Sequence, residues 1–251
     1  MSTGAQYRNG IQTFYEKNTF ETVMPMAPLF FADDFIGAGH SAGVPAAASP
    51  VAGYPWVKKI VGAGLPTVAL APNATGGQMQ LALTATSELQ DAVLYWNDNL
   101  AIDVTKGTVW EARAALSVPP SVAGVQVVFG LAAAWINGPD NNVKYLEFGC
   151  TANNNLLMRS QDGTTQNSIA ALNAGAAVAL DTNFHIFRIS AENTADIAFY
   201  FDGNRVNANG SVSYTATGAN AILQPYVAVY KTVSTGLATL LVDKVDLWSN
   251  R

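Results

Sequence analysis

The chain has 251 residues, a length that suits one large all-β domain or two smaller ones. Only 12% of its residues are charged and its net charge is −5, with the lysines and arginines scattered, so it lacks the clustered basic patch that nucleic-acid binding needs. No apolar run approaches the roughly 20 residues of a membrane span. We therefore expect no nucleic-acid partner and no membrane partner.

Cysteine content and the first residues indicate where the protein is made. Cys150 is the single cysteine, so no internal disulfide can form. The first eight residues lack the apolar segment of a signal peptide, which predicts synthesis in a reducing cytoplasm. Ala, Gly, Asn and Thr fill the surface positions that Lys and Glu usually occupy, and such a surface favours protein contacts.

The first part of the chain is expected to be irregular. Residues 1–28 are polar and aromatic without steady periodicity, and Pro25 and Pro28 disfavour a helix or a central strand, so we expect an extended N-terminal arm. Residues 29–35 predict the first core strand. The Gly, Ala, Ser and Pro residues of the stretch 37–53 predict a long loop, and loops of that length are commonly held against a neighbouring molecule.

From residue 54 onward, alternation at period two predicts antiparallel strands separated by turns. In the stretch 109–118, one row is apolar and includes Trp110 and Leu116, which predicts a core face. The alanine-rich stretch 168–180 predicts a short turn rather than a helix, because it contains glycine and has no amphipathic stripe.

The end of the chain predicts a hairpin and a closing strand. Asp202 and Gly203 supply the positive backbone dihedrals of a tight turn. In the closing strand, alternation places one row on a single face: Leu241, Asp243, Val245 and Leu247.

Five segments carry a resemblance to a known fold family. They are Asp33-Asp-Phe35, Trp110-Glu-Ala-Arg113, Val127-Val-Phe-Gly-Leu131, Phe201-Asp-Gly203 and Val242-Asp-Lys-Val-Asp-Leu-Trp248. In this order they resemble the concanavalin A-like, laminin-G-like jelly roll, over roughly residues 29–251. The resemblance implies an all-β fold, an antiparallel β-sandwich, with residues 29–251 as one jelly-roll domain and residues 1–28 as an extended N-terminal arm.

Within that superfamily, the absent signal peptide, the low charge and the arm make the chain similar to sandwich domains of tailed-phage virions. The resemblance implies a non-enzymatic virion structural protein, a capsid decoration or cement protein, made in the cytoplasm of the bacteriophage's host. Its partners would be the major capsid protein or other virion proteins, and it would form a homo-oligomer. The arm and the loop 37–53 would bind the phage head.

A lectin-like carbohydrate-binding module on a virion appendage is the alternative. Such modules stack exposed aromatic rings on sugars and hold the hydroxyls with Asn, Asp and Gln. Trp96 and Trp135 are the candidate sugar contacts, because each precedes a polar turn rich in Asn and Asp, and further candidate aromatics are Tyr54, Trp56 and Tyr145.

A glycoside hydrolase is the third hypothesis, because one branch of the resembling fold carries two glutamates flanking an aspartate on one strand. This chain has no such triplet, and Glu111 and Glu147 stand apart, so we expect no catalysis. His40 and His185 are too far apart in the sequence to suggest a triad or a metal site.

No cofactor is expected either. The resembling family often holds a calcium ion where the first and last strands meet, and Asp34 and Asp243 lie in matching segments. They would supply only part of the six or more oxygens that calcium needs. Cys150 alternates with Phe148 in the pattern of a buried hydrophobe rather than a nucleophile.

Overall fold

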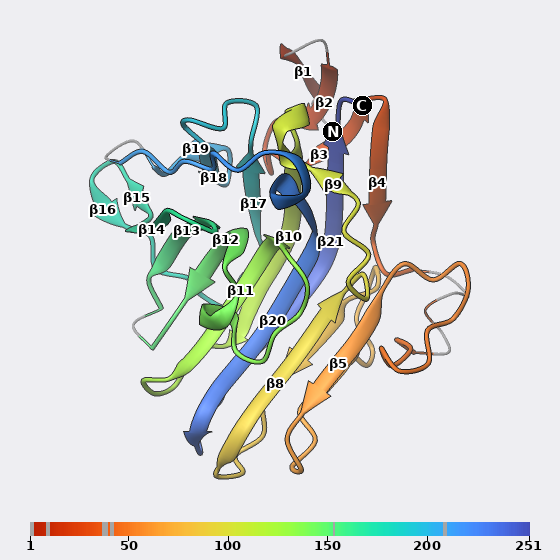
Figure 1. Ribbon diagram of the computed structural model, residues 1–251, viewed down its shortest axis with the longest axis vertical. Helices are drawn as coiled ribbons and strands as arrows, with labels where there is room; N and C mark the ends of the chain where they lie inside the picture. Colours follow the sequence, from red (N-terminus) through yellow and green to blue (C-terminus); the bar gives the residue numbers. More distant parts are fainter. Residues whose placement is uncertain (1–2, 9–10, 37–39, 41–42, 153, 208–209) are drawn as a thin grey trace.

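Two antiparallel sheets packed face to face form the body of the molecule in this computed structural model (Figure 1). The structure describes residues 3–8, 11–36, 40, 43–152, 154–207 and 210–251. We name the two sheets after a central strand of each. Within the described residues no helix is long and apolar enough to cross a membrane.

The β10 sheet has eight strands, with β4 and β7 pairing with successive parts of β21. In spatial order they are β19 (Asn204–Arg205), β18 (Ala198–Phe201), β17 (His185–Ser190), β10 (Val109–Val118), β21 (Thr239–Ser249), β7 (Met79–Ala82) and β6 (Thr67–Leu70), with β4 (Leu29–Asp33) on β21.

The β20 sheet also has eight strands, with β9 pairing with the start of β20. In spatial order they are β14 (Gln166–Ala170), β13 (Leu156–Asp162), β12 (Lys144–Cys150), β11 (Val125–Ala132), β20 (Ile222–Ser234), β8 (Glu88–Tyr95) and β5 (Val57–Val61), with β9 (Ile102–Asp103) on β20. The described residues also contain three 3-10 turns: η1 (Val104–Lys106), η2 (Pro139–Asn141) and η3 (Gly218–Ala221).

The space between the sheets is filled by one large apolar cluster, as the alternation predicts. Trp110 and Leu116 on β10 face Phe129 and Phe148 on the other sheet, and the rings of Phe129 and Phe148 stack with their centroids 5.7 Å apart. Cys150 lies in the same cluster and is 1% exposed, which confirms its prediction as a small buried hydrophobe. The predicted all-β sandwich is therefore confirmed.

The predicted hairpin joins β18 to β19. Asp202 and Gly203 have φ values of 46° and 76°, the left-handed conformation that a two-residue turn requires. The stretch 168–180 holds no helix: β14 is followed by β15 (Leu172–Asn173) and β16 (Ala176–Ala177), which pair around a tight turn.

The predicted row in the closing strand β21 is wrong for its first half. Val245 and Leu247 face the core, but Leu240 and Val242 do so in place of Leu241. The register against β10 shifts between the pairs Arg113–Lys244 and Ala114–Val242, so Asp243 is the extra residue of a β-bulge. The extra residue of a bulge exchanges the two faces of the strand beyond it. A prediction that assumes strict alternation therefore assigns the residues beyond the bulge to the wrong face.

The segment 1–28 is expected as an extended arm, but its described residues, 3–8 and 11–28, include three strands that pair into an antiparallel sheet. Its strands are β1 (Thr3–Arg8), β2 (Ile11–Glu16) and β3 (Thr22–Met26). Pro25 is tolerated because β3 is an edge strand, whose outer N–H groups need no partner. This N-terminal sheet packs on the outer face of the β10 sheet, where Ile11 contacts Val109 and Trp248.

The long loop 37–53 is described only in part, because residues 37–39 and 41–42 lie outside the described residues. In the described part, the Ala47 N–H donates to the Lys58 carbonyl and the Lys58 N–H donates to the Pro45 carbonyl. These bonds cover the outer edge of β5 at Lys58, so this part of the loop is held by the sandwich itself.

Candidate functional site

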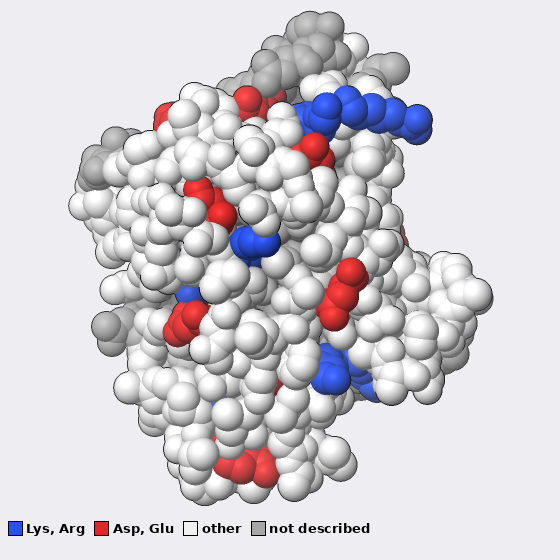
Figure 2. Space-filling model, in the orientation of Figure 1, with Lys and Arg blue, Asp and Glu red and all other residues white. Residues whose placement is uncertain are grey.

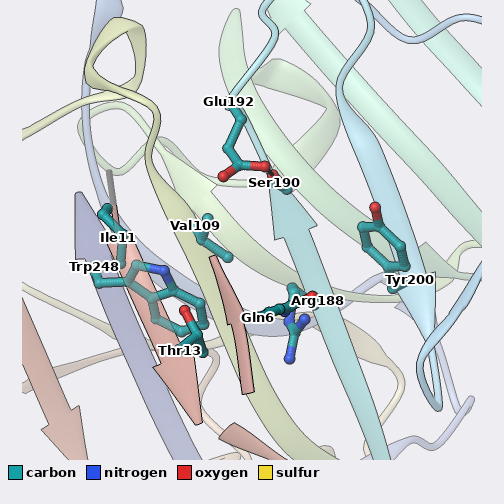
Figure 3. Close-up of a pocket in the computed structure, with 9 residues that line it drawn as sticks. All are labelled: Gln6, Ile11, Thr13, Val109, Arg188, Ser190, Glu192, Tyr200 and Trp248. Carbon is teal, nitrogen blue, oxygen red and sulfur yellow. Dashed lines mark hydrogen bonds between the residues drawn. The ribbon is translucent and has the colours of Figure 1, made fainter. Parts of the chain in front are cut away.

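A groove runs along β17, between the N-terminal sheet and the outer face of the β10 sheet. We call it the β17 groove. Figure 3 shows its narrow end, where Trp248, Ile11 and Thr13 stand on one side and Tyr200 of β18 on the other. Ser190 and Glu192 lie at one end of this part, and the Ser190 hydroxyl donates to the Glu192 carboxylate at 3.2 Å.

The groove widens next to Tyr200 into a compartment of about 160 Å³. We call it the middle compartment. Three half-buried or exposed aromatic rings line it together with two polar side chains: Tyr15, Phe20, Tyr200, Gln6 and Arg188. The compartment therefore combines apolar ring surface with hydrogen-bonding groups in an open hollow.

Two glycines allow the aromatic rings to approach the backbone. A Cβ at Gly4 would lie 2.5 Å from the Tyr15 ring, and a Cβ at Gly203 would lie 2.4 Å from the Phe20 ring. Gly203 thus serves twice, as the φ-positive residue of the β18–β19 turn and as the surface on which Phe20 rests. The turn between β2 and β3 is seated on the turn between β18 and β19.

A buried ion pair forms the floor of the groove. Glu111 on β10 is 2% exposed, and its carboxylate accepts from Arg188 Nε at 2.6 Å and from the Thr22 N–H at 2.8 Å. Arg188 also donates to the Thr22 hydroxyl at 3.0 Å and to the Phe20 carbonyl at 3.4 Å. These bonds join the N-terminal sheet to the sandwich and fix the Arg188 side chain in the groove wall.

On the other side of Phe20 lies a third compartment, of about 320 Å³, which we call the outer compartment. His185 lies there with Nδ1 2.7 Å from Asp202 and Nε2 3.0 Å from Asp181. The hydrogen bond to Asp202 raises the pKa of His185, burial opposes it, and the bond to Asp181 adds to the rise. Both ring nitrogens of His185 therefore have a carboxylate as hydrogen-bond partner, which explains the residue without a catalytic or metal-binding role.

The two tryptophans predicted as sugar contacts lie at neighbouring turns but do not present their rings together. The Asp98 carboxylate accepts from the Trp135 N–H at 2.6 Å and from Gln224 Nε2 at 3.1 Å, which ties the turn after Trp96 to the loop that carries Trp135. The Trp96 ring packs against Phe31, with centroids 4.9 Å apart. Lys59 Nζ stands 4.7 Å over the Trp135 ring, so an ammonium group occupies one face of that ring.

The other candidate aromatics are structural. Trp56 and Tyr145 are fully buried. The Tyr54 hydroxyl lies 2.5 Å from His40 Nδ1, and His40 Nε2 lies 3.0 Å from Asp33, so these side chains hold the loop before β5 onto β4. Burial, with a contribution from Asp33, raises the pKa of Tyr54 to about 12.

The outer face of the β20 sheet is covered by the chain's own β11–β12 loop, residues 133–143. Asp91 on β8 is fully buried beneath this loop, and its Oδ2 accepts from Trp135 Nε1 at 3.2 Å. At the far side of the loop, Asp140 pairs with Arg159 on β13. Burial raises the pKa of Asp91 to about 7.

Glu111 and Glu147 lie on opposite faces of the molecule. Glu111 is on β10 beneath the N-terminal sheet, and Glu147 is on β12, in the other sheet, 3.5 Å from Arg159 Nε. Both side chains are almost completely buried. A glycosidase needs two carboxyl groups facing one sugar bond, about 5 to 9.5 Å apart. This geometry does not bring these two glutamates together for that task.

Asp34 and Asp243 both border the turn at Gly76 and Gly77. Asp243 is engaged, because Arg113 Nη1 donates to its carboxylate at 2.5 Å, and Asp34 accepts from the Ile36 N–H at 3.3 Å. Among the residues that the structure describes, no group of three or more His, Cys, Asp or Glu side chains is arranged to hold a metal ion.

Sequence reasoning did not find the β17 groove. Its walls come from the segment 1–28, which has no steady periodicity, and from the polar row of β17 that contains Arg188 and Ser190. The sequence did contain one signal for it. An arginine on the outer face of a strand indicates that another segment packs over that face, and the segment 1–28 was the one with no place assigned in the sandwich.

No family model matches the sequence, and no curated protein matches it. Solved structures do match its fold. A protein of unknown function from Shewanella oneidensis MR-1 aligns with a TM-score of 0.58 and 11% identity, over 87% of this chain and 85% of that one. A glycoside hydrolase family protein from Mycobacterium thermorestibile aligns with a TM-score of 0.51 and 17% identity, over 88% and 100%.

The carbohydrate recognition domain of Emp47p is also similar, with a TM-score of 0.51 and 11% identity, over 86% of this chain and 97% of that one. At these identities the likeness concerns the fold alone, and the same fold serves binding domains and enzymes. The chain therefore has a concanavalin-like jelly-roll sandwich.

Proposed function

We propose that the protein is a non-catalytic, lectin-like carbohydrate-binding module and that the β17 groove is its binding site. The observation that carries this proposal is the middle compartment, where three aromatic rings surround an open hollow together with Arg188 and Gln6. Aromatic faces pack on the apolar C–H faces of sugar rings, while guanidinium and amide groups bond the hydroxyls. The solved structures of similar fold that include a carbohydrate recognition domain are consistent with this use.

A binding role without catalysis is supported by the bonds that hold Glu111, the buried glutamate beneath the groove. Glu111 faces the groove floor, but Arg188 and Thr22 occupy its oxygens. General acid catalysis needs a carboxyl group that can reach the glycosidic oxygen and exchange its proton. The groove holds its nearest buried glutamate in an ion pair instead.

Tyr200→Ala should lower glycan affinity at least tenfold without unfolding the protein, because it removes one ring from the middle compartment. One good aromatic contact contributes about 1.4 kcal/mol, which corresponds to a tenfold change in affinity. Tyr200→Phe keeps the ring and should retain most of the affinity. The measurement is a glycan array on the intact protein, followed by calorimetric titration of the best ligand.

Trp135→Ala is the matched control, since it removes an aromatic ring from the β11–β12 loop, on the outer face of the other sheet. If Trp135→Ala abolishes binding and Tyr200→Ala does not, the site lies at the sequence-predicted tryptophan instead. An array with no signal for the intact protein would remove the carbohydrate proposal.

A virion structural role is the second candidate, favoured by the low charge of the surface. In Figure 2, charged side chains on the face of the β20 sheet are few and separated by neutral surface. Four apolar side chains near hairpin ends are at least 37% exposed, a composition that suits protein contacts: Leu65, Val118, Val122 and Val233. Docking through a detached arm would break the Glu111–Thr22 bonds, so attachment through these hairpins is the form we propose.

Co-sedimentation with capsid shells that lack the protein tests this second candidate. Saturation at a fixed copy number per shell is the expected result for a decoration or cement protein. Protein that stays in the supernatant at all concentrations would remove the candidate and leave the carbohydrate proposal alone.

A further inference from the structure

The outer compartment repeats the chemistry of the middle one. It is lined by the Phe184 ring and by polar side chains of the β2–β3 and β18–β19 turns, namely Asn18, Thr19 and Asp202. The Arg113 guanidinium stands 4.5 Å from the Phe184 ring centroid and occupies one face of that ring, so the aromatic lining that is left is the rest of the Phe184 ring and the Phe20 ring. Each compartment therefore offers an aromatic surface with hydrogen-bonding groups around it.

The two compartments are adjacent along one strand. Phe20 lines both, and Arg188 and Phe184 are four residues apart, a distance of about 13 Å along an extended strand. A single sugar ring cannot fill both. A ligand made of repeating units, each with an apolar face and a rim of hydroxyls, would place one unit against each aromatic surface.

Three basic side chains of the groove each face a carboxylate. Arg188 is neutralised by Glu111, Arg113 by Asp243, and His185 stands between Asp181 and Asp202. The chain as a whole carries a net charge of −5. An anionic polymer would meet no unpaired cation among these groups and would be repelled by the overall charge. The groove suits an uncharged ligand.

We infer that the β17 groove binds a linear, uncharged oligosaccharide that lies along β17 and crosses Phe20, with separate subsites at Tyr200 and Phe184. This inference rests on the proposed carbohydrate binding and specifies its ligand as the interior of a chain rather than a single terminal sugar. Gain of affinity with chain length follows, because only a chain longer than a disaccharide spans the roughly 13 Å to the outer compartment, where its further units add contacts without a second association cost.

The test is calorimetric titration of the full-length protein with gluco- and manno-oligosaccharides of two to six units. Affinity should rise at least tenfold from the shortest to the longest ligand. Phe184→Ala should remove most of that gain while leaving disaccharide affinity nearly unchanged. Asn18→Ala, an exposed change in the β2–β3 turn, serves as a second variant if Phe184→Ala lowers the thermal stability.

The outcomes separate this inference from the proposed function. Equal affinity for short and long ligands, with both variants silent, would overturn the subsites while the Tyr200 site stands. No binding of any neutral glycan would overturn both. Tighter binding of acidic oligosaccharides, or of an extended peptide in competition, would overturn the inference that the ligand is an uncharged glycan.

Discussion

Arg188→Ala is expected to lower the free energy of unfolding by about 3 to 5 kcal/mol, the usual cost of leaving one partner of a buried ion pair alone. Glu111, which is 2% exposed in the folded protein, would then have no cation at hydrogen-bond distance and would be held only by Thr22. The N-terminal sheet would also lose the bonds that Arg188 makes to Phe20 and Thr22. Urea denaturation at neutral pH measures the loss.

Two variants make this result specific. Arg188→Lys keeps a positive charge and should lose less stability, although lysine cannot reproduce the guanidinium bonds to three groups. Adding Glu111→Gln to Arg188→Ala should recover part of the loss, because the uncompensated charge is removed. A single Arg188→Ala variant as stable as the wild-type protein would mean that the N-terminal sheet is not docked through this pair.

Asp91→Asn is expected to raise the stability above pH 7 by up to about 4 kcal/mol and to change little near pH 4. Burial raises the pKa of Asp91 from 3.8 to about 7, and each unit of difference corresponds to about 1.4 kcal/mol. Because the folded state holds the proton more tightly than the unfolded state, the stability from this group is full below pH 4 and is lost as pH rises to about 7. Asparagine imitates the protonated side chain and removes this loss.

Asp162→Asn is the matched control, because its sign is opposite. Although burial alone would raise it, hydrogen bonds from Thr165, Thr215 and Thr164 lower the pKa of Asp162 to about 2. Its charged form is therefore stabilising at neutral pH, and its replacement should cost stability there. Thermal denaturation of both variants from pH 4 to 8 gives the comparison. Parallel pH profiles for wild type and Asp91→Asn would refute the assignment of the slope to Asp91.

The predicted sandwich follows from local patterns that the structure retains. The row with Trp110 and Leu116 faces the core because side chains alternate along a strand, and one face of each sheet must be buried. The turn at Asp202 and Gly203 follows from backbone preference alone. The bulge at Asp243 could not be found in this way, since it depends on the register that β10 imposes on β21.

The candidate site could not be predicted from local patterns either, because it also depends on distant segments of the chain. Which aromatic rings are exposed depends on what packs over them: Tyr145 is fully buried, Trp135 lies beneath Lys59, and Tyr200 faces an open groove. Alternation in the sequence tells which side chains of a strand share a face. It does not tell whether another segment of the chain covers the outer face of the sheet.

The sequence by itself determined the class of fold, the burial of Cys150 and the position of the hairpin at Asp202 and Gly203, because each depends on residues close together in the chain. Only the tertiary structure decided that β1, β2 and β3 form a sheet on the sandwich and thereby make the β17 groove. That outcome depends on Glu111 and Arg188, which lie about 90 and 170 residues beyond Thr22, and pairing over such distances leaves no local pattern.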